Sequence, residues 1–126
     1  MIFKSFEINK IDKKINQLIL FYGKNEGLKN EALNILIKDE NNILNYDEKE
    51  VLDNENSFIE NILSKSLFEK EKFIVIKRTT DKILKVIETL HLKNLEDTTI
   101  ILNSDNLEKK SKLRSLFEKD KKLVCI

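Results

Sequence analysis

The chain has 126 residues, the length of one domain with room for a hydrophobic core. Hydrophobic residues make up 40% and charged residues 36%, which is typical of a globular domain and excludes a disordered or fibrous chain. The net charge of +1 argues against a dedicated nucleic-acid-binding protein, and a single cysteine excludes an internal disulfide.

Targeting and membrane signals are missing from the sequence. Charged residues interrupt positions 1–12, so this segment does not resemble a signal peptide. No apolar run approaches the roughly 20 residues that a membrane-spanning helix needs. We therefore expect a cytoplasmic protein without a membrane partner.

The first elements in chain order are a strand, a helix and a second strand. The apolar run 17–22 stops at Gly23 and predicts a buried strand. Residues 28–38 carry apolar side chains at helical spacing, and residues 42–46 predict a weaker strand.

A loop and a second helix are expected next. The acidic, polar segment 47–56 predicts the loop. Ser57 followed by Glu60 fits a capping box, in which the two side chains satisfy free amides at a helix start. This predicts a helix that begins at Ser57 and runs towards Phe68, with an apolar stripe of Phe58, Ile59, Ile62 and Leu63.

The second half of the chain continues the alternation. Residues 73–76, 98–102 and 123–126 predict strands, and residues 81–91 and 107–119 predict helices. Because the strands are continuous apolar runs, both faces of the sheet should be covered. We therefore predict an α/β fold, with a parallel sheet of about five strands and helices on both faces, as a single domain over residues 1–126.

The turn after the first strand is the natural place for a phosphate loop. The segment from Gly23 to Asn30 fails the pattern G-x-x-x-x-G-K-[ST]. Gly23 and Gly27 are one residue too close, and Lys29 is displaced from its place beside the second glycine. Asn30 replaces the magnesium-binding hydroxyl, and Glu26 would bring a negative charge into the site. We expect a vestigial phosphate loop and no cofactor.

Other catalytic arrangements have little support. Phosphoryl transfer needs an acidic residue at a strand end to hold the metal, whereas Lys77 and Arg78 follow the strand 73–76. His91 is the only histidine and is expected at a helix end. Cys125 lies in an apolar run, as expected of a buried structural thiol. We predict no catalytic residue and no metal site.

A family resemblance rests on several short segments in order. The chain resembles the N-terminal domain of the delta subunit of the bacterial DNA polymerase III clamp loader over nearly its whole length. The resembling segments are 20–23 with Glu26 and Gly27, 45–47, 66–68 followed by 73–76, and 100–104 followed by 110–113. The resemblance implies an AAA+/RecA-like three-layer domain whose phosphate loop is degenerate. It also implies that the lid and collar domains of the family are absent from this chain.

The resemblance also implies a function. In this family a Leu-Phe pair after a serine inserts into a hydrophobic pocket of the ring-shaped sliding clamp, the beta subunit, and helps to open the ring. The matching residues are Ser66, Leu67 and Phe68. The domain would be a non-catalytic part of a DNA-directed DNA polymerase holoenzyme. It would reach DNA indirectly and the other clamp-loader subunits through the missing domains.

The residue pattern leaves alternatives open. At about 100° per residue, Phe68 falls opposite the apolar stripe of the preceding helix, as expected of a partner contact. Alternatively, that helix ends near Ser66 and the pair turns into the core. The basic residues around 107–119 fit a DNA or partner contact, or a solvated face. A divergent P-loop nucleotide hydrolase and a DNA-binding domain remain the alternative functions.

Overall fold

The computed structural model describes residues 18–23, 26–36, 43–63, 72–92, 98–105, 107–108, 110–119 and 123–125. The elements in chain order are β1 (Leu18–Phe21), α1 (Glu26–Leu36), β2 (Ile43–Asp47), α2 (Glu48–Asp53), α3 (Glu55–Leu63), β3 (Lys72–Lys77), η2 (Asp81–Ile83), α4 (Leu84–His91), β4 (Thr98–Asn103), α5 (Lys112–Lys119) and β5 (Leu123–Cys125).

The strands form one sheet in the order β2-β3-β4-β1-β5. Every strand pair in the described part of the chain is parallel. In this register Leu20 of β1 lies between Leu102 of β4 and Cys125 of β5. The predicted α/β class with a parallel sheet and helices is therefore confirmed.

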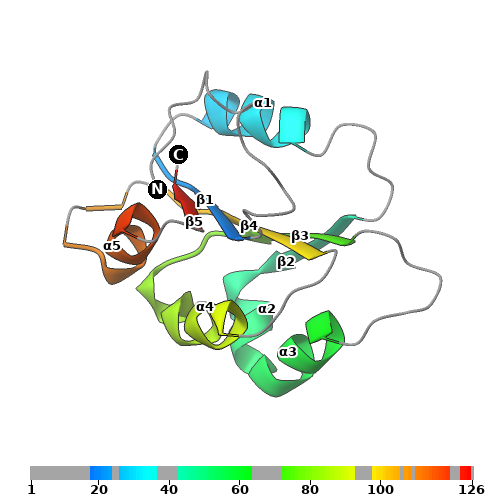
Figure 1. Cartoon of the computed structure of the whole chain (residues 1–126). Coiled ribbons are helices and arrows are strands. Elements are labelled where there is room, and N and C mark those ends of the chain that lie inside the picture. The colour runs from blue at the N-terminus through cyan, green and yellow to red at the C-terminus, as the bar shows by residue number, and fades with distance from the viewer. Residues whose placement is uncertain are drawn as a thin grey trace.

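Helices pack against both faces of this sheet (Figure 1). On one face, Ile19 and Phe21 of β1 pack with Ala32 and Leu36 of α1. The alternate strand residues face a second core, which is built with α2, α3, α4 and α5. Both faces of β1, β3 and β4 are thus buried, which explains their continuous apolar runs.

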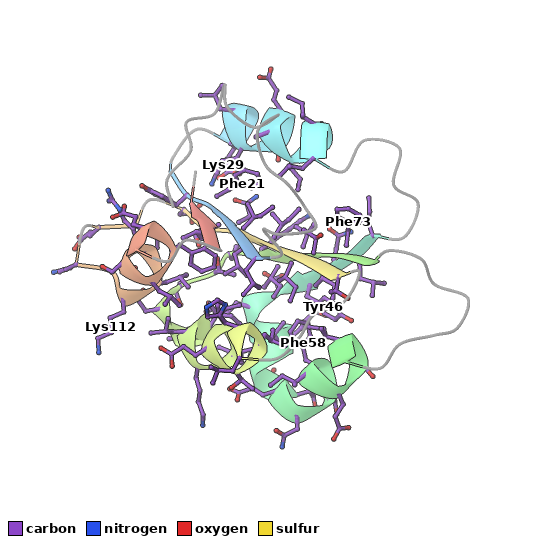
Figure 2. The ribbon with its side chains drawn as sticks, in the orientation of Figure 1. Phe21, Lys29, Tyr46, Phe58, Phe73 and Lys112 are labelled. Atoms are coloured by element: carbon purple, nitrogen blue, oxygen red, sulfur yellow. The ribbon has the colours of Figure 1, made fainter. Side chains whose placement is uncertain are left out.

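The predicted helical stripes lie in this second core. Ile83, Val86, Ile87 and Leu90 are all buried, as the spacing of residues 81–91 indicates. Phe58 and Ile62 of α3 are buried as well, and Phe58 contacts Tyr46 edge-to-face with ring centroids 5.2 Å apart (Figure 2). This contact anchors α3 on the strand β2.

The prediction of a loop over 47–56 was wrong, because α2 and the start of α3 occupy this segment. The amide of Asp47 donates to Glu50 Oε1 at 3.2 Å, one half of a capping box at the start of α2. Val51 is buried and provides the apolar contact of this short helix. Acidic residues thus start a helix here where their polarity indicated a loop.

Three predicted helix starts are also shifted. The Phe58 amide donates to the Asn54 carbonyl at 2.9 Å, so α3 begins at Glu55, before the predicted cap Ser57. The helix α1 begins at Glu26 rather than at residue 28. The helix α5 begins at Lys112 rather than at 107. The carboxylate of Asp81 in η2 accepts hydrogen bonds from the first amides of this helix.

Candidate functional site

The carboxyl edge of β1 and β4 is the candidate site. The strand β1 is followed by α1 on one face of the sheet, and its neighbour β4 is followed by α5, which packs on the other face (Figure 1). In open α/β sheets, ligands bind where two neighbouring strands lead to opposite faces in this way. The residues at this corner therefore decide what the fold can bind.

Backbone hydrogen bonds join the turns after β1 and β4. The Gly23 amide donates to the Asp105 carbonyl at 3.2 Å, and the Ser104 amide donates to the Phe21 carbonyl at 2.8 Å. Gly23 has a φ of 125°, which side-chain-bearing residues rarely adopt. Gly23, the start of the turn after β1, is thus hydrogen-bonded to the turn after β4.

Lys29 fills the corner with its own side chain. It lies in the first turns of α1, its side chain is 7% exposed, and it extends towards the sheet near Phe21 (Figure 2). Its ammonium donates to the Ser104 carbonyl at 2.8 Å and lies 2.7 Å from Glu26 Oε1. The positive charge of Lys29 is therefore balanced by the carboxylate of Glu26.

Gly23, Gly27 and Lys29 of the predicted vestigial loop are described, whereas residues 24 and 25 lie outside the described residues. Gly23 and Lys29 meet at the corner, on either side of Ser104. Gly27 is an exposed residue in the first turn of α1. The carboxylate of Glu26 forms an ion pair with Lys29 and so brings a negative charge to the corner.

A second buried contact closes the corner towards β3. The hydroxyls of Thr79 and Ser104 are hydrogen-bonded, and both residues are buried. The Thr79 amide donates to the carbonyl of Asn103, the last residue of β4, at 3.2 Å. In the described part of the chain, no buried side-chain nitrogen or oxygen lacks a hydrogen-bond partner. Among the described residues of this corner, no buried side-chain donor is therefore left without a partner.

At the far end of the edge, Asp47 and Arg78 form a bidentate ion pair. Arg78 Nε donates to Asp47 Oδ1 at 2.8 Å, and a terminal guanidinium nitrogen donates to Oδ2 at 2.6 Å. The hydrogen bond from Arg78 lowers the pKa of Asp47, and Asp47 raises the pKa of Arg78. Arg78 has a φ of 57°, in the left-handed region. Both oxygens of this strand-end carboxylate are engaged by Arg78.

The other acidic groups of the edge organise the backbone. Glu48 is buried and accepts hydrogen bonds from the amide and hydroxyl of Thr80. Asp81 accepts from the Ser111 hydroxyl at 2.6 Å and from two amides at the start of α5. The hydrogen bond from Ser111 is the main reason that the pKa of Asp81 is lowered.

Metal binding has no visible basis in the described ranges. No group of three or more His, Cys, Asp or Glu side chains there lies close enough to hold an ion. His91 is the last residue of α4, at the helix end that the sequence predicts, and Cys125 lies in β5. No described helix is long and apolar enough to cross a membrane.

The predicted clamp-binding residues Ser66, Leu67 and Phe68 lie outside the described residues. Their role stays a prediction.

Comparison of the chain with protein-family models, curated proteins and solved structures finds no match.

Proposed function

We propose that the chain is a non-catalytic protein-interaction domain of the clamp-loader delta type. It binds the sliding clamp and helps to open it during DNA replication, and it hydrolyses no nucleotide. The observation that carries the proposal is the closed corner, in which Glu26 and Ser104 hold the ammonium of Lys29. In this domain the side chain of Lys29 is bound by other residues of the chain at the position where a phosphate would bind. This arrangement fits a subunit that has the fold of a nucleotide-binding domain but does not hydrolyse nucleotide.

The strand order supports the finer part of this proposal. It differs from the orders 3-2-1-4-5-6 and 2-1-3-4-5 of the common doubly wound folds. The strand β4 lies between β1 and β3, with β5 beside β1. An order outside these two common folds is compatible with the AAA+/RecA-like three-layer domain of about five strands that the sequence resemblance implies.

The hydrolase alternative conflicts with the electrostatics of the corner. A phosphate would have to displace the Glu26 carboxylate from Lys29 and expose the lysine to water or to the ligand. Asp47 is the acidic residue at the end of β2, and both of its carboxylate oxygens accept hydrogen bonds from Arg78. These hydrogen bonds would have to break before Asp47 could bind magnesium. The DNA-binding alternative lacks the basic excess that phosphate binding usually needs.

Within a polymerase holoenzyme in the cytoplasm, this domain would use Leu67 and Phe68 as anchors in a hydrophobic pocket of the clamp. The test is the affinity of the chain for the sliding clamp of its own organism, compared between the wild type and Leu67→Ala/Phe68→Ala. We expect the double variant to lose about 2 kcal/mol of binding free energy, roughly 30-fold in dissociation constant.

A matched control is available on α1. Leu28 and Ile35 are about half exposed, so Leu28→Ala/Ile35→Ala also removes exposed apolar surface, and we expect it to bind the clamp as the wild type does. Equal loss in both variants would assign the effect to nonspecific apolar contact. A folded wild type that does not bind the clamp would refute the proposal.

A further inference from the structure

An open depression of about 540 Å³ lies beside the start of α5, and neither Lys29 nor Ser104 lines it. Lys82 of η2, Lys110 and Lys112 contribute cationic groups to it, and Leu107 contributes apolar surface. The volume falls within the range of sites that enclose a small ligand or a few side chains. The function proposed above uses none of these residues.

Acidic groups line the same depression, but their charges are already engaged. Asp81 caps α5 through the Ser111 hydroxyl and the amides of Lys112 and Leu113. Glu108 forms an ion pair with Lys110 at 3.3 Å. Both carboxylates thus keep their charge but are held in internal contacts, and Lys110 is paired, which leaves Lys82 and Lys112 as the lysines of the depression for a partner.

Lys82 and Lys112 are the remaining described lysines of the depression, and Lys112 also acts electrostatically on the carboxylate of Asp81. Both are exposed, and neither forms an ion pair with another described residue within 4 Å. Lys112 extends outward from the first turn of α5 (Figure 2). The half-buried side chain of Leu107 lies on the same depression and adds an apolar contact.

We propose that this depression binds a short acidic peptide segment of a partner protein. Carboxylates of the segment pair with Lys82 and Lys112, and an apolar side chain packs on Leu107. A peptide is favoured over a nucleic acid because its carboxylates can be spaced to meet Lys82 and Lys112 alone, whereas the phosphates of a nucleic acid repeat at every nucleotide and would also meet Asp81 and Glu108. The net charge of +1 also gives no long-range attraction for a polyanion.

The test uses a fluorescein-labelled six-residue peptide of glutamate and leucine and measures its anisotropy at low salt, where screening is weak. The site variant is Lys82→Gln/Lys112→Gln. The control is Lys49→Gln/Lys77→Gln, which removes the same charge from exposed residues that do not line the depression. Circular dichroism confirms that both variants keep the fold.

We expect the dissociation constant of the peptide to rise about tenfold in the site variant, the scale of two ion pairs of up to about 1 kcal/mol each. We expect the control to change it less than about threefold. No binding by the wild type, or an equal loss in both variants, would overturn the proposal. Tighter binding of a labelled hexathymidylate than of the peptide would assign the depression to nucleic acid instead. Clamp binding through Leu67 and Phe68 is measured separately, so either proposal can fail alone.

Discussion

The Lys29 side chain is almost completely removed from water, and the cost of burying its charge is offset by one carboxylate and one carbonyl. Glu26 precedes Lys29 by about one helical turn, so the ion pair between these two residues could be predicted from their spacing. The other contact joins α1 to Ser104, 75 residues further along the chain, and could not be predicted from spacing. The sequence therefore predicts a broken phosphate loop but not how the chain closes it.

We expect Lys29→Met to destabilise the fold by about 1–3 kcal/mol, because the Ser104 carbonyl loses its charged donor while the length of the side chain is kept. Urea denaturation gives the free energy of unfolding. The exposed Lys49→Met is the control and should stay within about 0.5 kcal/mol of the wild type. Equal stability of Lys29→Met and the wild type would mean that the buried contact contributes nothing.

At the scale of elements, the strands could be predicted well because burial on both faces leaves continuous apolar runs. The helix α2 was missed because its buried side consists of little more than Val51 and Glu48 in an acidic segment. The contacts that order the carboxyl edge link Asp47 to Arg78, Glu48 to Thr80 and Asp81 to Ser111. Each spans 30 to 32 residues, so it becomes visible only when the strand register is known.

The contact of Asp81 with the start of α5 leads to a prediction about the stability of this helix. We expect Asp81→Ala to lower the free energy of unfolding by about 1 kcal/mol, the typical value of a lost helix cap. Since the folded pKa of Asp81 lies below its ordinary value, its contribution is complete at neutral pH. This contribution decreases once the pH falls below about 4, the ordinary pKa of Asp, and it is gone once the pH is below the lowered pKa of the folded state.

The measurement is the free energy of unfolding from pH 7 to pH 3 for the wild type and Asp81→Ala. The difference between the two should shrink towards the acid end. A difference that stays constant over the whole range would show that the carboxylate charge is not what holds the start of α5.

For the whole molecule, the contacts of Lys29 with Glu26 and Ser104 predict that nucleotide does not change the stability of the fold. We expect millimolar Mg²⁺-ATP to leave the melting temperature unchanged. A ligand at 100 times its dissociation constant would add about 2.7 kcal/mol, which is a shift of several degrees for a domain of this size. Differential scanning fluorimetry with and without ATP separates the two cases, and a clear rise would favour the hydrolase alternative.

The position of β1 in the sheet also constrains how the chain reaches its native state. Leu18 of β1 pairs with Ile100 of β4 on one side and with Leu123 of β5 on the other. The ribosome synthesises both of these neighbouring strands long after β1. During synthesis on the ribosome, β1 therefore has no native partner strand until most of the chain has emerged. Such high contact order slows folding and leaves an apolar strand exposed in the nascent chain. Chaperone demand during translation should accordingly be set by the first strand rather than by the length of the domain.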